Sequence, residues 1–286
     1  MTALGLHRQD ADVFVPDELP IDDALARTTD LGIGAHADDL EFMCIVPIGE
    51  CLMSDARWFA GITCTDGAGA ARGGRFAACT DADIVAIRRD EQRRAAAIGR
   101  YGAMVQLAHT SSEARSAGGQ AELVEDLRTV LEATRPVNVY THNPADKHHT
   151  HVAVVAATIR AIREISRADR PSRLVGVEAW RDLDWLPDGE KIRFDATPYA
   201  ELAQRLAAVH ESQIEGAKRY DVAARGRRQA NATLFETRGR DDAEEVVVAI
   251  DLTPLVRNDE LDPIDHVLSS IDRFRGDVDR ARRWFG

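Results

Sequence analysis

The sequence predicts a Rossmann-like α/β fold, in which helices cover both faces of a mostly parallel sheet and a smaller cap region follows towards the C-terminus. Two observations support this prediction. Short apolar runs alternate with longer helical runs over residues 31–166, an order typical of parallel βαβ units. Clusters of histidine and aspartate directly follow two of the apolar runs, at the place where open α/β sheets bind their ligands.

The predicted strands are apolar runs bounded by charged residues, glycine or proline. They are 31–35, 57–65, 104–108, 137–142, 173–180 and 244–252. Helices are predicted where apolar residues recur at helical spacing. They are 21–28, 41–54, 81–100, 121–135, 151–166, 199–220 and 264–286. For 41–54 a strand is the alternative, and Pro47 and Gly49 favour the helix. We expect Asp81 or Asp83 to cap the 81–100 helix, and the apolar face of 264–286 to pack on its own domain.

The chain is long enough for one large domain. Of its 286 residues, 44% are hydrophobic and 29% are charged, which is typical of a globular protein with a sizeable core. We expect an N-terminal arm over 1–28 and a Rossmann-like, metal-binding catalytic domain over 29–170. Residues 171–286 are expected to complete the site and form the cap, within one continuous domain.

The charge balance excludes some partners. Forty-eight acidic and 36 basic residues give a formal charge of −12, which disfavours nucleic acid as a partner. The basic stretch 219–228 is interpreted as an exposed helix end. No apolar window reaches the roughly 18 residues of a membrane span, and the first residues lack a signal-peptide pattern. The four cysteines form no disulfide pattern, so we expect a cytoplasmic protein. A homo-oligomer is left open.

The first cluster is His36-Ala37-Asp38-Asp39-Leu40-Glu41, directly after the 31–35 strand. Adjacent carboxylates repel each other unless a cation lies nearby, so a metal ion would explain why Asp38 and Asp39 stand side by side. The alternative is that one aspartate caps the following helix and His36 is incidental.

The second cluster runs from Thr141 to His151 and lies between the 137–142 strand and the next helix. His148 and His151 are three residues apart, so on a helix they share one face. Two strand-end clusters of nitrogen and oxygen ligands together predict a metal site. Two imidazoles and one carboxylate with an open position suit catalytic zinc, with iron(II) as the alternative. Zinc lowers the pKa of its bound water, and a neighbouring carboxylate can take the proton, so these parts predict metal-assisted hydrolysis.

Other residues have a structural interpretation. His109 and His210 are expected to be structural or to lie in a pocket wall. The aromatic residues Trp180, Trp185 and Tyr199 are expected to pack in the core, with a sugar-binding platform as the alternative. Gly32 and Gly34 resemble a dinucleotide-binding turn, but no third glycine follows them.

With these residues in view, the chain resembles the PIG-L/LmbE family of zinc-dependent N-deacetylases. The family motif A-H-P-D-D-x-E matches residues 35–41, and the family motif H-P-D-H matches residues 148–151. A T-x-G loop matches residues 65–67, an R-x-x-E helix matches residues 88–91, and a late H-x-S/T-Q element matches residues 210–213. The resemblance covers about residues 30–165 and is weaker afterwards.

The resemblance implies a set of roles. His36, Asp39 and His151 would bind zinc, and Asp38 would be the general base. The other implied roles are an oxyanion donor and leaving-group acid at His148, and substrate contacts at Arg88 and in the Thr65-Asp66-Gly67 loop, where we assign Asp66. The substrate implied is a small acylated amino-sugar conjugate of the N-acetylglucosamine type.

This sequence departs from the family pattern in three ways. After the third strand, where the family often has an acidic substrate-contact residue, residues 107–112 contain no carboxylate. Ala37 replaces the proline of the first motif, and Thr150 replaces the aspartate that would orient His148. We expect Asp146 to supply that carboxylate and to hydrogen-bond an imidazole of the cluster, namely that of His148.

Three functions compete on this evidence. The first is a zinc-dependent N-deacetylase acting on an N-acetylglucosamine-type conjugate. The second is a zinc amidase with a substrate that is not a sugar. The third is a Rossmann-like nucleotide-binding domain without chemistry, in which a stoichiometric metal ion would have no place.

Overall fold

One eight-stranded sheet organises the chain. The computed structural model describes residues 4–216 and 218–286. The strand order is β1-β4-β3-β2-β5-β6-β8-β7. The bounds of the strands are β1 Asp12–Phe14, β2 Asp30–Gly34, β3 Phe59–Thr65, β4 Ala103–His109, β5 Asn138–His142, β6 Arg173–Val177, β7 Lys191–Asp195 and β8 Val246–Asp251. The Rossmann-like, mostly parallel sheet is confirmed.

The five central strands are parallel and the edges are antiparallel. β4, β3, β2, β5 and β6 run in one direction, whereas β1 pairs antiparallel with β4, and β8 pairs antiparallel with both β6 and β7. All six predicted strands are present. The two edge strands, β1 and β7, were not predicted, because both are short and carry only two strongly apolar residues each.

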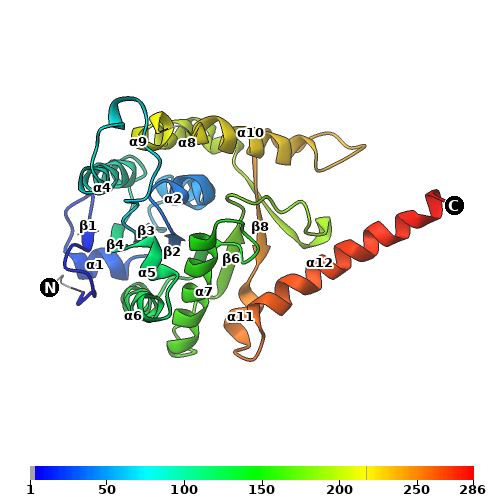
Figure 1. Cartoon of the computed structure of the whole chain (residues 1–286). Helices are drawn as coiled ribbons and strands as arrows, with labels where there is room; N and C mark the ends of the chain where they lie inside the picture. The colour runs from blue at the N-terminus through cyan, green and yellow to red at the C-terminus, as the bar shows by residue number, and fades with distance from the viewer. Residues whose placement is uncertain (1–3, 217) are drawn as a thin grey trace.

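Helices cover both faces of this sheet (Figure 1). One face carries α2, α3, α4 and α8, and the other carries α1, α5, α6, α7 and α11. The bounds of the α-helices are α1 Ile21–Ala26, α2 Asp39–Met43, α3 Ile45–Leu52, α4 Asp81–Ile98, α5 Ser111–Ala114, α6 Ala117–Thr134, α7 His149–Glu164, α8 Ala200–Ala207, α9 Glu211–Glu215, α10 Tyr220–Thr233, α11 Thr253–Arg257 and α12 Pro263–Arg280. Short 3₁₀ turns lie at Gly74–Phe76, Asp188–Glu190, Thr197–Tyr199 and Ala281–Trp284. Two apolar cores therefore form, one on each side of the sheet.

Two predictions about helix ends were wrong. The cap of α4 is Thr80, whose hydroxyl accepts from the backbone N–H of Asp83 at 3.2 Å, while the Asp83 carboxylate accepts from the Thr80 N–H at 2.8 Å. Asp83 is thus the second half of a capping box and not the cap itself. The single helix predicted over 199–220 is broken into α8 and α9, because His210 has a non-helical backbone, with φ −83° and ψ 56°.

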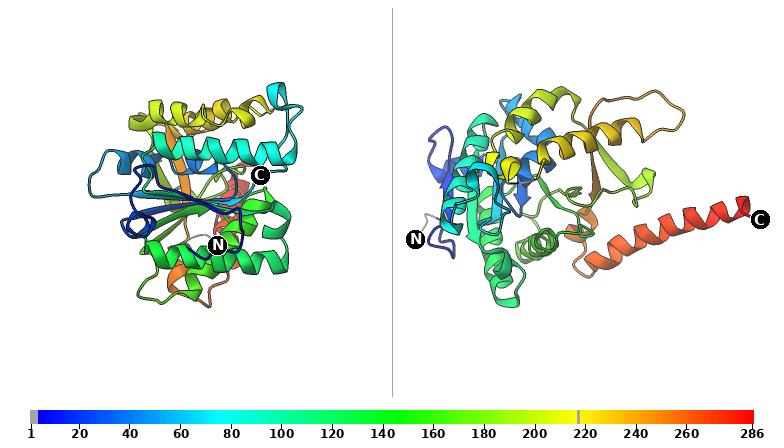
Figure 2. Two further views of the ribbon diagram at one scale, coloured as in Figure 1. Left: turned by 90° about the vertical axis from the view of Figure 1, so that its left-hand side faces the viewer. Right: turned by 45° about the horizontal axis from the view of Figure 1, so that its top comes forward.

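The expectation that the last helix packs along its length on its own domain was wrong. Figures 1 and 2 show α12 running away from the body of the protein towards the C-terminus. Only Val267 and Ser270 are buried among the residues of α12. Apolar side chains on α12 and after it are exposed, and they are Ile264, Leu268, Phe274, Val278, Trp284 and Phe285.

The strand order changes direction at one point in the sheet. From β2 the chain proceeds through β3 to β4 on one side, and β5 and β6 follow on the other side of β2. The switch point of the strand order therefore lies between β2 and β5. Both predicted clusters follow these two strands, so the fold brings them to one edge.

Candidate metal centre and active site

The end of β2 presents three polar side chains to the switch point. His36 follows the strand by two residues, and Asp38 and Asp39 open α2. The Asp39 carboxylate accepts from the backbone N–H of His36 at 2.7 Å, which fixes its direction. Burial disfavours the charged form of Asp39, but the imidazoles of His151 and His142 outweigh it and hold the pKa of Asp39 well below its usual value.

The loop after β5 supplies the second group. His148 stands just before α7, and His151 lies in its first turn, fully buried. The Asp146 carboxylate lies 3.3 Å from His151 Nδ1 and also accepts from the backbone N–H groups of His148 at 2.9 Å and Trp180 at 3.0 Å. An Nδ1–H held by Asp146 leaves the lone pair of His151 Nε2 free to bind a metal ion.

Nitrogen and oxygen atoms from the two clusters converge on one point. His151 Nε2 lies 3.3 Å from His36 Nδ1 and 3.5 Å from Asp39 Oδ1, and His36 Nδ1 lies 3.3 Å from Asp39 Oδ2. Ligands at about 2.0–2.1 Å from a tetrahedral zinc ion lie about 3.3–3.4 Å from one another. The three side chains therefore have the spacing and the donor chemistry that fit zinc.

One histidine near this point was not singled out from the sequence. His142, the last residue of β5, lies 3.3 Å from Asp39 Oδ2 and stacks on His151 with ring centroids 3.8 Å apart. Its Nε2 already accepts the backbone N–H of Ala35 at 3.0 Å. Burial lowers the pKa of His142 to about 4, so it is neutral. With that lone pair engaged, His142 packs against the centre and does not supply a free ligand atom.

Asp38 is held in a strained position beside the centre. Its backbone lies in the left-handed region, with φ 93°, which is unfavourable for a residue with a side chain. The N–H of Asp38 is 3.3 Å from the side-chain oxygen of Gln92, whose amide nitrogen in turn donates to Glu41 at 2.8 Å. Burial, and then the adjacent Asp39, raise the pKa of Asp38 to about 7. A carboxylate with this pKa is suited to take and return a proton near neutrality.

Glu41, the last residue of the first motif, organises the buried side of the site. Besides Gln92, it accepts from the hydroxyl of Tyr101 at 2.7 Å and lies 3.1 Å from His210 Nε2. Burial opposes the charged form of His210, but the contact with Glu41 outweighs it and raises the pKa of His210. His210 does not line the cavity. The structural interpretation of this residue is therefore confirmed.

Of the two residues expected to contact substrate, Arg88 lines the cavity and Asp66 does not. Arg88 is buried and donates to the carbonyl oxygens of Ala37 at 2.8 Å and Gly67 at 3.1 Å, so it joins the two motif loops, and it lines the cavity. Asp66 accepts the backbone N–H of Ala68 at 3.1 Å and is not among the residues lining the cavity.

A cavity of about 820 Å³ opens in front of these groups. Trp180 lines it and stacks on His148, with ring centroids 5.8 Å apart and an interplanar angle of 29°. The prediction that Trp180 packs in the core was wrong, whereas Trp185 and Tyr199 do pack against the two cores. Burial lowers the pKa of the half-buried His148. Its Nδ1 has no hydrogen-bond partner among the described residues.

The basic stretch 219–228 is more than an exposed helix end. Most of it lies in α10, and Arg219, Tyr220 and Arg227 line the cavity. Arg228 is buried and contacts Glu245 at 2.7 Å. The prediction that this stretch is helical is confirmed. The prediction that it is freely exposed is wrong, because α10 covers the mouth of the site.

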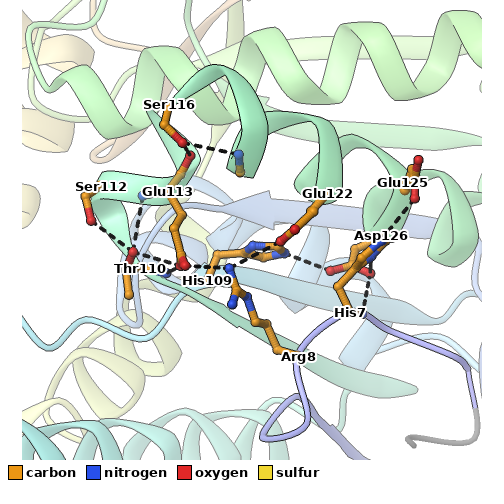
Figure 3. Close-up of polar contacts among 11 residues, drawn as sticks. His7, Arg8, His109, Thr110, Ser112, Glu113, Ser116, Glu122, Glu125 and Asp126 are labelled. Atoms are coloured by element: carbon orange, nitrogen blue, oxygen red, sulfur yellow. Dashed lines mark hydrogen bonds and ion pairs between the residues drawn. The ribbon is translucent and has the colours of Figure 1, made fainter.

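His109 is structural. Its Nε2 lies 2.7 Å from one oxygen of the buried Asp126, and the other oxygen of Asp126 contacts His7 Nδ1 at 2.8 Å. Figure 3 shows Asp126 between the two histidines, with Arg8 beside Glu113 and Glu122. This network ties the N-terminal segment to α6 and β4.

The paired glycines of β2 serve packing. A Cβ on Gly32 would lie 2.7 Å from the ring of Phe59, and one on Gly34 would lie 3.0 Å from the Cβ of Asp39. Both positions are thus filled by side chains, so these glycines form no cradle for a phosphate.

Solved structures share this fold. The N,N'-diacetylchitobiose deacetylase of Pyrococcus horikoshii has a TM-score of 0.64 at 17% identity, covering 81% of this chain and 86% of that chain. A deacetylase of the teicoplanin biosynthetic pathway has a TM-score of 0.55 at 17% identity, covering 78% and 98%. GalB, the 4-carboxy-2-hydroxymuconate hydratase of Pseudomonas putida, has a TM-score of 0.62 at 15% identity, covering 79% and 96%. At these identities the likeness shows the fold alone, and the fold carries more than one chemistry.

The fold and the His/Asp cluster define the class, an α/β enzyme with a candidate metal centre at the switch point of its sheet. Residues 31–162 match the PIG-L family, described as GlcNAc-PI de-N-acetylase, and this core of the chain belongs to that family. By this family match, and not by the likeness of fold, the chain is a hydrolase of amide bonds, of the N-deacetylase type. No curated protein matches the chain. Among the described residues, no helix is both long and apolar enough to cross a membrane.

Proposed function

We propose that the protein is a zinc-dependent N-deacetylase that hydrolyses the N-acetyl amide of an N-acetylglucosamine-type conjugate. The observation that carries the proposal is the spacing of His36 Nδ1, Asp39 and His151 Nε2, each 3.3 to 3.5 Å from the next, beside the buried Asp38. Iron(II) is the alternative metal, since the same ligand set suits it.

Each residue has a proposed task. A bound zinc ion would polarise the amide carbonyl and lower the pKa of water. Asp38 takes a proton from the attacking water, since its raised pKa is close to neutrality. His148 faces the same point, with ring centroids 4.9 Å from His36, and donates an N–H to the developing oxyanion. As the C–N bond breaks, the leaving amine takes up the proton that Asp38 received from the water, while His148 keeps its N–H on the oxygen.

The sugar assignment is supported by the cavity. Trp180 offers an apolar face next to His148, and sugars pack their C–H faces on such rings. Arg88 lies between the two motif loops at the cavity wall. We also propose a cytoplasmic location, because all four cysteines are free.

The test is release of acetate from the metal-loaded protein, with and without a chelator. The panel contains N-acetylglucosamine glycosides and N-acetylated amines without a sugar. Chelator-sensitive release from the glycosides supports the proposal. Release only from amines without a sugar would replace the first function by the second. A protein that binds neither zinc nor iron and releases no acetate would contradict both.

A further inference from the structure

The first motif follows β2 in a tight turn made by His36, Ala37, Asp38 and Asp39. The backbone carbonyl of His36 accepts from the N–H of Asp39 at 3.3 Å, and Asp38 has φ 93° and ψ −28°. Ala37 is not among the residues with positive φ. These values define a type II β-turn, with Asp38 at the third position, where the positive φ falls.

The residue types of this turn do not explain its conformation. Glycine or asparagine is usual at the third position of a type II turn, because a positive φ is unfavourable for most residues with a side chain. A type I turn differs mainly by reversal of its central peptide and has φ of about −90° at that position, which suits Asp38 better. Ala37 is compatible with both types. Contacts from elsewhere in the fold must therefore hold the peptide between Ala37 and Asp38 in its observed orientation.

Two side chains of α4 contact the two ends of that peptide. Arg88 Nη2 donates to the carbonyl oxygen of Ala37 at 2.8 Å, and the side-chain oxygen of Gln92 accepts from the N–H of Asp38 at 3.3 Å. Arg88 and Gln92 are four residues apart on the helix, so they share one face. Both side chains are buried, and neither hydrogen bond faces bulk water. We call these two side chains the α4 clamp.

A reversed peptide would lose both of these hydrogen bonds. The N–H of Asp38 would then face the guanidinium of Arg88, and the carbonyl oxygen of Ala37 would face the side-chain oxygen of Gln92. Donor would meet donor and acceptor would meet acceptor. Buried polar groups left without partners carry a large free-energy cost, so the α4 clamp selects the type II turn over the type I turn.

The clamp side chains are themselves held in one orientation. The amide nitrogen of Gln92 donates to Glu41 at 2.8 Å, so the amide oxygen of Gln92 must face Asp38. Arg88 Nη1 donates to the carbonyl oxygen of Gly67 at 3.1 Å, and Arg88 forms no ion pair among the described residues. Glu41, the last residue of the first motif, thus acts on Asp38 through Gln92.

We propose that the α4 clamp holds the peptide between Ala37 and Asp38 in the type II orientation and thereby points the Asp38 carboxylate at the reacting centre. Reversal of the peptide would change φ of Asp38 by about 180° and turn its Cα–Cβ bond in another direction. The inference rests on the proposed function, in which Asp38 is the general base. It makes Arg88 and Gln92 positioning residues, a task that for Arg88 is separate from contact with substrate.

Gln92→Leu tests the clamp without altering the cavity, because Gln92 is not among the residues that line it. The assay uses the metal-loaded protein and the methyl glycoside of N-acetylglucosamine. We expect kcat to fall by about 10- to 100-fold, since misplacement of a reacting group by about 1 Å can cost about 10²-fold. KM and metal content should stay close to the wild-type values, because neither the cavity wall nor the proposed ligands change.

Gln106→Leu is the matched control. Gln106 is also buried and also contacts α4, where its amide donates to the carbonyl oxygen of Arg89 at 3.2 Å, but it makes no hydrogen bond with the turn. This variant should keep the wild-type kcat. A Gln92→Leu enzyme with near-normal kcat would overturn the inference and leave the deacetylase function intact.

The double variant Arg88→Met, Gln92→Leu distinguishes one clamp from two independent contacts. Because both side chains hold a single peptide, the double variant should be no slower than the slower of the two single variants. Losses in kcat that simply multiply would show that Arg88 and Gln92 act separately, and the inference would fail.

A crystal structure of the double variant gives a result that does not depend on turnover. The peptide should be reversed, with φ of Asp38 near −90° as in a type I turn. A peptide that keeps its wild-type orientation would overturn the inference even if kcat falls. If the wild-type protein hydrolyses no substrate, the proposed function fails, and this structure alone decides whether the clamp exists. If the double variant does not fold, the kcat and the crystal structure of Gln92→Leu decide in its place.

Discussion

The Asp146 carboxylate lies 3.3 Å from Nδ1 of His151 and contacts His148 only through its backbone N–H. The sequence led us to expect that Asp146 orients the His148 imidazole, and that expectation is corrected here. Asp146 instead fixes the orientation of a proposed metal ligand. The same carboxylate also accepts from the backbone N–H groups of His148 and Trp180. These contacts fix the loop before α7 next to the cavity wall at Trp180.

This contact predicts what Asp146→Ala does. Losses of groups that orient metal ligands typically cost about 10–100-fold in metal affinity or activity, so we expect metal affinity to fall by that factor. Metal content after dialysis against a graded chelator measures it. His148→Ala should keep the metal and slow turnover.

The double variant separates the two roles. Because the two side chains act through different imidazoles, their effects on kcat/KM at saturating metal should multiply. A double variant no slower than His148→Ala would mean that Asp146 acts through His148 after all.

Removing a ligand should remove the metal. His151→Ala is expected to lose most of the zinc or iron while the fold persists, because the apolar face of α7 is untouched. Elemental analysis together with circular dichroism measures both. His149→Ala, whose side chain is exposed on the same turn, should retain about one metal ion per chain. Full occupancy in His151→Ala would refute the ligand assignment.

The adjacent carboxylates of Asp38 and Asp39 should have different functions. Asp39→Asn is expected to weaken metal binding, since an amide is a poorer ligand than a carboxylate. Asp38→Asn should keep the metal and lower kcat by roughly 10²–10⁴-fold, as for a general base. If Asp38→Asn kept near-normal kcat in the metal-loaded enzyme, another group would have to take the proton.

The N-terminal segment should make stability depend on pH. The hydrogen bond with Asp126 outweighs burial and raises the pKa of His7, with Glu125 and Glu122 adding to the effect. A raised folded-state pKa contributes stability that is fully present below the unfolded value of about 6.5 and is lost as the pH rises through the folded value. Burial opposes ionisation of Asp126, but contacts with His109 and His7 lower the pKa of Asp126, so it stays charged throughout this range.

His7→Gln tests this sign, because glutamine keeps a donor but carries no charge. The wild-type protein should have a higher Tm than His7→Gln at pH 5.5, and the difference should shrink by pH 9. A difference that grows with pH would show that the neutral imidazole, and not the cation, stabilises the fold.

The sequence by itself determined the elements and the chemistry of the site. Helical periodicity, apolar runs and two polar clusters each depend on residues close together in the chain, so the central strands, α4, α6 and α7 could be predicted. The two motifs also identified the candidate ligands, because both follow strands whose carboxyl ends must share one edge of a parallel sheet.

Only the tertiary structure decided how these parts meet. His210 breaks the expected 199–220 helix because it is buried against Glu41, 169 residues away. Trp180 faces the cavity because Asp146 holds its backbone, and α12 leaves the body because little of it finds a surface to pack on. Each outcome depends on contacts between residues distant in sequence, whose free energies local patterns do not contain.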